Sequence, residues 1–197
     1  MDSQTLNIGI FGGTFNPPHS AHIIVAEHLL KSIPLDKIIF VPSFITPHKD
    51  EGEEELAGHR LEMVRLATKG RRYFEVSDIE IQRRGKSFTY ETVETFNATA
   101  PNDKLFVIMG MDNFLEFETW KFPERIVKIA TLLVMTRPAY DISSSSAPFF
   151  NSARFVPVPS MDISSSSIRD RIKTHRSIHA IVPPAVEDYI VKQGLYQ

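Results

Sequence analysis

Two histidines, three positions apart, follow a pair of glycines at a place where the chain could surround a phosphate. Gly12 and Gly13 end an apolar run, and His19 and His22 stand at the start of a predicted helix. Residues three apart share one face of a helix, and a helix N-terminus attracts negative charge. Two imidazoles and free backbone N–H groups there can stabilise charge developing on a phosphate. The pair could instead lie on the surface, or belong to a metal site with a third ligand elsewhere.

A second candidate anion site lies near the end of the chain. The run ISSSSI (163–168) is followed by Arg169. Serines cap helix N-termini and leave backbone N–H groups exposed, and arginine can offer two parallel hydrogen bonds to a phosphate. Taken alone, simple helix capping explains the serines at least as well, because a second serine run at 143–146 has no arginine beside it.

Both segments resemble motifs of the nucleotidyltransferases that carry an [H/T]xGH motif. GGTFNPPHSAH (12–22) is similar to GGTFDPxHxGH, and ISSSSIR (163–169) is similar to ISSTxxR. The resemblance implies a Rossmann-like fold that binds ATP. It also implies that His19, His22 and Arg169 stabilise the transition state of nucleotidyl transfer.

The first motif departs from the family pattern at two positions. Asn16 stands where aspartate is usual, and Ala21 replaces the glycine whose missing side chain admits the adenosine. We expect the methyl group of Ala21 to shift ATP slightly or to need compensation elsewhere. Both departures would also fit a non-catalytic ATP-binding protein of the same fold, which would release no pyrophosphate.

The resemblance further implies which residues contact ATP, and that Mg²⁺ accompanies ATP to neutralise its triphosphate. We predict no metal site built from protein ligands. The predicted ATP-binding residues are Gly12, Gly13, Thr14, Phe15, His19, His22, Gly110, Asp112, Arg137, Ser165, Ser166, Ile168 and Arg169.

Three further features resemble the bacterial nicotinate-mononucleotide adenylyltransferases within that family. PSFITPHK (42–49) is similar to PxxxPxHK, EIQRRGKSFTYET (80–92) is similar to ExxRxGxSYTxxT, and Trp120 follows a GxD motif at 110–112. The resemblance implies that the acceptor contacts His48, Lys49, Thr89, Asp112 and Trp120.

Each acceptor residue has an implied role and a plainer alternative. Lys49 would hold the acceptor phosphate, and Thr89 would face the nicotinate carboxylate. Trp120 would stack on the pyridine ring, because the face of an indole attracts an electron-poor ring as it attracts a cation. Without the resemblance, Lys49 would lie in a solvated loop, Thr89 would cap a helix and Trp120 would be ordinary core.

The predicted reaction is in-line transfer of the adenylyl group of ATP to nicotinate mononucleotide, which gives deamido-NAD and pyrophosphate in NAD biosynthesis. The same chemistry on nicotinamide mononucleotide or phosphopantetheine stays open. The dinucleotide fingerprint GxGxxG is absent after the first strand, and Glu80 stands where a P-loop ending at Gly85–Ser87 needs its first glycine.

Alternating apolar segments must position these residues. The pattern predicts a doubly wound α/β fold with a parallel sheet, formed by a single nucleotidyltransferase domain over 1–197 whose C-terminal helical part spans about 163–197. The expected strands are 6–11, 37–42, 74–81, 105–109, 131–136 and 154–159, and the expected helices are 19–32, 59–69, 89–98, 123–130, 168–175 and 185–193. Residues 82–88 are expected to form a basic turn, and 138–152 a polar loop.

Composition narrows the class of protein. The net charge of −2 carries no basic bias toward nucleic acid, and the absence of cysteine excludes disulfides and thiolate metal sites. No apolar run approaches the ~20 residues of a membrane span, and no signal peptide is recognisable. We therefore expect a cytoplasmic enzyme that acts on ATP and a mononucleotide, with no membrane or nucleic-acid partner. Assembly into a homo-oligomer is left open.

Overall fold

Six parallel strands form the centre of the protein in a computed structural model, which describes residues 5–46, 54–136 and 148–197. The strands lie in the order β3-β2-β1-β4-β5-β6, and every neighbouring pair is parallel. Their bounds are β1 Asn7–Gly13, β2 Lys37–Pro42, β3 Phe74–Val76, β4 Lys104–Gly110, β5 Ala130–Thr136 and β6 Ala153–Pro157. The doubly wound Rossmann-like prediction is confirmed.

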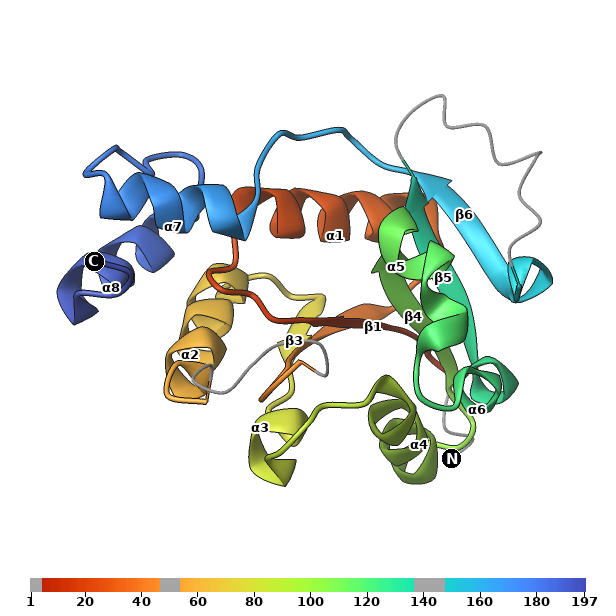
Figure 1. Ribbon diagram of the computed structural model, residues 1–197. Helices are drawn as coiled ribbons and strands as arrows, with labels where there is room; N and C mark the ends of the chain where they lie inside the picture. The colour runs from red at the N-terminus through yellow and green to blue at the C-terminus, as the bar shows by residue number, and fades with distance from the viewer. Residues whose placement is uncertain (1–4, 47–53, 137–147) are drawn as a thin grey trace.

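Helices cover both faces of the sheet (Figure 1). They are α1 Ser20–Ser32, α2 Ala57–Thr68, α3 Ile79–Arg83, α4 Thr89–Thr99, α5 Met111–Leu115, α6 Pro123–Ile129, α7 Ser165–Lys173 and α8 Pro184–Gln193, with 3₁₀ turns at Phe117–Thr119 and Phe150–Ser152. No helix in the described ranges is long and apolar enough to cross a membrane.

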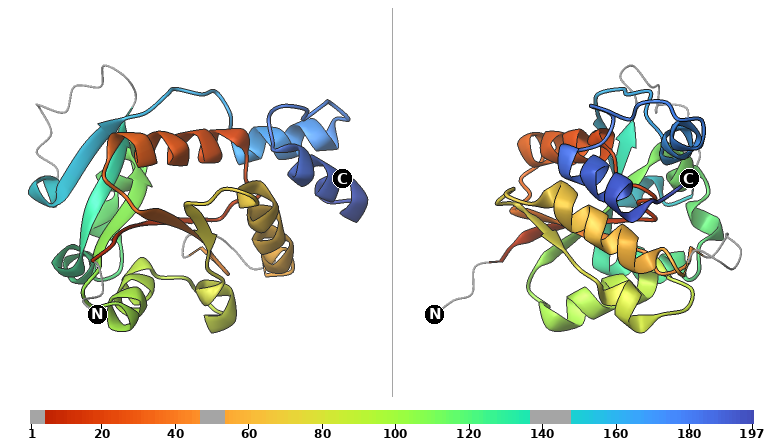
Figure 2. Two further views of the ribbon diagram at one scale, coloured as in Figure 1. Left: turned by 180° about the vertical axis from the view of Figure 1, so that it is seen from behind. Right: turned by 90° about the vertical axis from the view of Figure 1, so that its left-hand side faces the viewer.

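Two hydrophobic clusters hold these layers together. Helices α1, α2, α7 and α8 contribute to one cluster, which includes Leu29, Met63, Ile168 and Val186. Helices α4 and α6 contribute to the other on the opposite face, through Val93 and others. The C-terminal helices therefore share a core with α1, and α7 lies beyond the N-terminal end of α1, roughly end to end with it (Figures 1 and 2).

The chain reverses its direction of winding between β1 and β4. It runs outward from β1 through β2 to β3, then returns across the sheet to β4 and continues outward to β6. The loops that follow β1 and β4 therefore diverge and leave a crevice at the carboxyl ends of these two strands. Ligands of open α/β sheets bind at such a switch point.

The prediction of one strand over 74–81 is wrong beyond Val76. Strand β3 pairs with only three residues of β2. The chain then forms helix α3, which covers the end of the expected strand and the start of the expected basic turn. The backbone N–H of Ser77 makes a last contact with β2 by donating to the Phe40 carbonyl, and Glu80 then turns inward to Thr92. An edge strand has a partner on one side only, so local contacts decide where it ends.

Candidate active site

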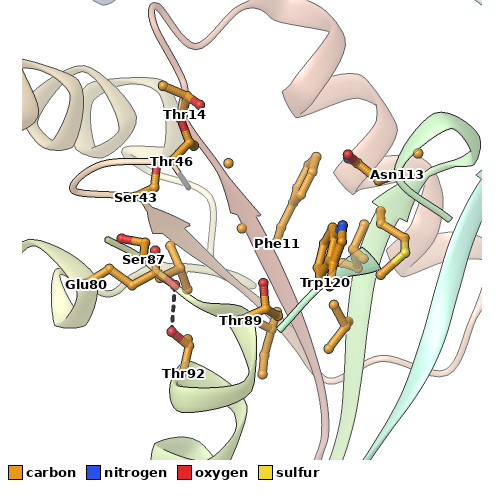
Figure 3. Close-up of a pocket in the computed structure, with 18 of the residues that line it drawn as sticks. Phe11, Thr14, Ser43, Thr46, Glu80, Ser87, Thr89, Thr92, Asn113 and Trp120 are labelled. Atoms are coloured by element: carbon orange, nitrogen blue, oxygen red, sulfur yellow. Dashed lines mark hydrogen bonds between the residues drawn. The ribbon is translucent and has the colours of Figure 1, made fainter. Parts of the chain in front are cut away.

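A cavity of about 750 Å³ opens at the switch point. The end of β1 lines it with Gly12, Gly13 and Thr14, and the end of β4 lines it with Gly110. Figure 3 shows Thr14 and Ser43 toward one end of this cavity, and Thr89 and Trp120 toward the other. This volume and position are typical of a site for small molecules.

The two histidines lie together at the N-terminus of α1. The rings of His19 and His22 stack with their centroids 3.7 Å apart, and His22 Nδ1 accepts the backbone N–H of His19 at 3.1 Å. His22 lines the cavity. The His19 ring is buried, and its Nδ1 has no hydrogen-bond partner among the described residues. The spacing of three residues therefore brings both imidazoles to one point, as the sequence predicts.

Burial keeps both imidazoles neutral near pH 7. Removal from water lowers the pKa of His19 to about 4. It also lowers the pKa of His22 well below its ordinary value, and repulsion by a charged His19 lowers it further. Each ring therefore carries one N–H, which can donate a hydrogen bond to a phosphate oxygen. An arriving phosphate would stabilise the charged form and oppose the effect of burial.

Aromatic packing shapes the turn that precedes these histidines. The Phe15 ring contacts the His22 ring edge-on at 5.0 Å and is almost fully buried. A Cβ atom at Gly13 would lie 3.1 Å from that ring. The missing side chain of Gly13 therefore lets the Phe15 ring pack against the backbone of Gly13, and Phe15 in turn packs against the His22 ring.

Helix α7 brings the serine–arginine motif against the same turn. Ser165 Oγ donates to the Pro17 carbonyl at 2.8 Å, and Arg169 Nη1 donates to the Asn16 carbonyl at 2.7 Å. The side chain of Asn16 accepts a hydrogen bond from Tyr196 Oη at 2.6 Å. The two motifs, nearly 150 residues apart, therefore meet beside the histidines.

Three further predicted ATP contacts, Asp112, Ser166 and Ile168, do not line the cavity. Ile168 is fully buried in the core, and its backbone N–H donates to the Ser164 carbonyl. Ser166 is exposed, and its Oγ lies 3.1 Å from Ser164 Oγ. Asp112 is exposed in the first turn of α5. Arg137 lies outside the described residues.

The predicted acceptor residues are partly assembled. Thr89 begins α4 and Trp120 follows the 3₁₀ turn at Phe117–Thr119, and both line the cavity. The Trp120 ring leans on Phe117 with centroids 5.3 Å apart, so one face is supported by core. Ala21 is half-buried and does not line the cavity. His48 and Lys49 lie outside the described residues.

Sequence reasoning missed a buried arginine that holds the site together. Arg60 of α2 is fully buried and donates to the carbonyls of Thr14 at 2.8 Å, Ser43 at 2.6 Å and Phe44 at 2.8 Å. It therefore ties the turn after β1 to the turn after β2. Arg60 shares a helix face with residues three and four positions away that are all apolar and buried, namely Ala57, Met63 and Val64. A single arginine on such a face is the signal that could have revealed it.

Glu80 is a second missed residue, and it lies inside the cavity wall. Thr92 Oγ1 donates to Glu80 Oε1 at 2.6 Å, and burial raises the pKa of this carboxyl despite hydrogen bonds from Thr92 and Ser87. Ser87 Oγ also accepts the backbone N–H of Phe44 at 2.9 Å. The carboxyl therefore links the start of α4, which carries Thr89, to the turn after β2.

Comparisons with known proteins agree with this geometry. The cytidylyltransferase-like family matches residues 10–171. The nicotinate-nucleotide adenylyltransferase of Bacillus subtilis (strain 168) is 34% identical over 190 residues, which cover 96% of this chain and 98% of that protein.

Solved structures share the fold at lower identity. The Plasmodium falciparum nicotinic acid mononucleotide adenylyltransferase complexed with NaAD superposes with a TM-score of 0.77 at 23% identity, over 97% of both chains. The same protein complexed with APC gives a TM-score of 0.75 at 21% identity, again over 97% of both chains. These likenesses support the Rossmann-like nucleotidyltransferase fold.

Proposed function

This chain belongs to the cytidylyltransferase-like family and, within it, to the nicotinate-nucleotide adenylyltransferases, and we propose that it transfers the adenylyl group of ATP to nicotinate mononucleotide. The products are deamido-NAD and pyrophosphate, and the reaction belongs to NAD biosynthesis. The observation that carries this proposal is that the motif at 163–169 meets the motif at 12–22 beside one switch-point cavity. Ser165 donates to the Pro17 carbonyl, and Arg169 donates to the Asn16 carbonyl.

The reaction is a single in-line displacement. A phosphate oxygen of nicotinate mononucleotide forms a bond to the α-phosphorus of ATP. The bond from that phosphorus to the bridging oxygen of the β-phosphate breaks, and pyrophosphate leaves with the electron pair. The attacking phosphate is already ionised, so no strong general base is needed. Catalysis then consists of positioning and charge stabilisation.

We assign the charge stabilisation to both motifs. His19 and His22 donate their N–H groups toward the α-phosphoryl oxygens, and Arg169 with Ser165 and Ser166 holds the leaving pyrophosphate. Arg169 must exchange its hydrogen bond to a carbonyl for one to a phosphate, which is the stronger because both partners are charged. Mg²⁺ enters as part of the MgATP substrate and neutralises the triphosphate.

The acceptor occupies the end of the cavity that lies away from Thr14. There the indole of Trp120 offers a face for the pyridine ring, and the hydroxyl of Thr89 lies in the same wall. The sequence motifs assign His48 and Lys49 to the acceptor phosphate and Arg137 to ATP.

We assign this activity to a single domain. Residues 1–197 act as one domain, because α7 and α8 pack in the same cluster as α1 and α2. The enzyme works in the cytoplasm, where its adenylyl donor ATP is supplied. Light scattering would measure its oligomeric state.

Release of pyrophosphate from MgATP tests the proposal when three acceptors are assayed in parallel. We expect strong preference for nicotinate mononucleotide over nicotinamide mononucleotide and phosphopantetheine. A reaction without acceptor gives the background. Preference for another acceptor would keep the chemistry and discard the roles of Thr89 and Trp120. Release with none of the three, from protein that binds ATP, would favour a binding protein.

A further inference from the structure

Lys121 brings a positive charge to the acceptor end of the cavity. It directly follows Trp120, and both residues line the cavity. Within residues 5–46, 54–136 and 148–197, its ammonium group has no hydrogen-bond or ion-pair partner. By contrast, the nearby Arg125 forms two hydrogen bonds to the Glu94 carboxylate at 2.7 and 2.6 Å. The charge of Arg125 is therefore neutralised locally, and that of Lys121 is not.

Aromatic rings hold this ammonium group in place. Lys121 Nζ lies 4.1 Å from the centroid of the Phe88 ring, 5.9 Å from that of Tyr90 and 5.8 Å from that of Phe122. Attraction between a cation and the face of an aromatic ring favours such positions. Rings can attract a cation but cannot neutralise its charge, so the ammonium group keeps its capacity to bind an anion.

The same contacts place the charge next to Thr89. Phe88 and Tyr90 are the chain neighbours of Thr89, so a lysine held on their rings lies beside the hydroxyl assigned to the acceptor. The segment that carries Trp120 and the segment that carries Thr89 thus meet at this lysine. Figure 3 shows Trp120 and Thr89 toward the same end of the cavity.

Two carboxyl groups also line the cavity, and neither pairs with this lysine in the structure. Glu80 is engaged by Thr92 at 2.6 Å, and burial raises the pKa of its carboxyl, which favours the uncharged form. Glu116 lines the cavity without an ion pair to Lys121. An acceptor that brings its own carboxylate would therefore supply the anion that Lys121 lacks.

We propose that Lys121 is a specificity-determining residue that selects the carboxylate of nicotinate mononucleotide over the neutral amide of nicotinamide mononucleotide. This inference rests on the proposed function and refines it. The pyridine ring on Trp120 directs its carboxylate toward Thr89 and the Lys121 ammonium group. The amide form makes the same stacking contact but gains nothing from the charge.

The test compares Lys121→Met with Lys121→Arg and with the control Lys128→Met. Lys128 is an exposed lysine in the last turn of α6. For each variant, kcat and KM are measured for both mononucleotides at saturating MgATP, together with KM for ATP and Tm. We expect Lys121→Met to lower kcat/KM for nicotinate mononucleotide about 10-fold, mainly through KM, as when a hydrogen bond to a charged group is lost.

The other readouts separate charge selection from general damage. Activity on nicotinamide mononucleotide and KM for ATP should stay within twofold in Lys121→Met. Lys121→Arg should keep most of the preference because it keeps the charge, and Lys128→Met should match the wild type. An equal loss of kcat/KM on both acceptors would overturn the proposal, since it would mean that Lys121 binds the phosphate that both acceptors share or that it supports the fold. An unchanged preference would overturn it as well.

A failure of the proposed function would show in the wild-type enzyme, whereas a failure of the role of Lys121 would show only in the Lys121→Met variant. If wild-type enzyme did not use nicotinate mononucleotide, the proposed function itself would fall, and the role of Lys121 with it. If the wild type used that acceptor and only the Lys121→Met preference stayed unchanged, the proposed function would stand and Lys121 alone would lose its role.

Discussion

At the scale of single residues, the stacked histidines show how burial tunes the pair to which we assign phosphate binding. His19 and His22 lie with their ring centroids 3.7 Å apart, a distance at which two imidazolium ions would repel each other strongly. Burial avoids this repulsion by lowering the pKa of both rings. The free enzyme therefore presents hydrogen-bond donors at the α1 N-terminus without a preformed positive charge.

Removal of the cavity-facing imidazole should slow the chemical step. We expect His22→Ala to lower kcat by about 10²-fold or more, in line with the loss of one donor to the transition state. His28→Ala is the matched control on the same helix, where His28 Nε2 contacts the Pro157 carbonyl at 2.9 Å. Steady-state pyrophosphate release measures both variants. A decrease of less than threefold in His22→Ala would remove this residue from the mechanism.

At the scale of elements, the site depends on side chains that join turns to neighbouring helices. The turn after β1 receives Arg60 from α2 at the Thr14 carbonyl and Arg169 from α7 at the Asn16 carbonyl. Backbone carbonyls in such turns have no partner in the sheet, so each needs a donor from elsewhere. These arginines satisfy the carbonyls and fix the turn in the shape that faces the cavity.

Replacement of the buried arginine should destabilise the fold as well as the site. Arg60→Met leaves at least three carbonyls without their donor, and each unsatisfied buried group costs about 1–3 kcal/mol. We expect the free energy of unfolding to fall by about 3 kcal/mol or more, and KM for ATP to rise. Urea unfolding and steady-state kinetics measure the two effects.

Arg65 provides the control for this substitution on the same helix. Its side chain is half-exposed and lies 3.4 Å from Asp78 and 3.9 Å from Glu62. Exposed ion pairs contribute about 0–1 kcal/mol, so Arg65→Met should leave stability and kinetics nearly unchanged. If Arg60→Met were as stable as Arg65→Met, Arg60 would have no role in holding the turns.

At the scale of the whole molecule, the site is assembled from both ends of the chain. The backbone N–H of Ser20, in the first turn of α1, donates to the carbonyl of Ile181 at 2.9 Å. Tyr196, next to the last residue, contacts Asn16. The global stability of the protein is therefore coupled to the geometry of the turn between β1 and α1, where we propose that phosphate binds.

This coupling predicts that acid weakens the fold between pH 6.5 and about 4. The pKa of His19 in the folded state is about 4, and that of His22 is also lowered, so the unfolded chain binds more protons in this window. Stability must then fall as the pH falls, by up to about 1.4 kcal/mol per pH unit for each histidine. Urea unfolding at pH 7.5, 6.5, 5.5 and 4.5 measures the slope.

A variant comparison isolates the histidines from other titrating groups. Burial raises the pKa of Glu80, so this carboxyl changes stability in the opposite direction as the pH falls. The double variant His19→Gln, His22→Gln keeps Glu80 and should lose less stability than the wild type from pH 6.5 to 4.5. Parallel curves for the two proteins would contradict the lowered pKa values.

Local patterns were sufficient to predict most elements of this protein. Apolar runs, the glycines after β1 and the prolines near helix starts predict all six strands, the third with a wrong end, and the alternation that makes a parallel sheet. Period and turn chemistry act over a few residues, so such patterns are local. The short helix α3 was missed for the complementary reason. Its residues read as a strand, and the buried contact from Glu80 to Thr92 cannot be read from neighbours in the sequence.

The short motifs at 12–22 and 163–169 were enough to predict the fold class, the reaction family and the residues to which we assign phosphate binding. Three contacts emerge from the folded structure alone. Arg169 donates to the Asn16 carbonyl, Arg60 is buried beneath two turns, and the Lys121 ammonium group lies over the Phe88 ring. The physical reason is distance along the chain. Such contacts join residues whose separation is set by how the whole sheet and its helices pack, and no local pattern encodes that packing.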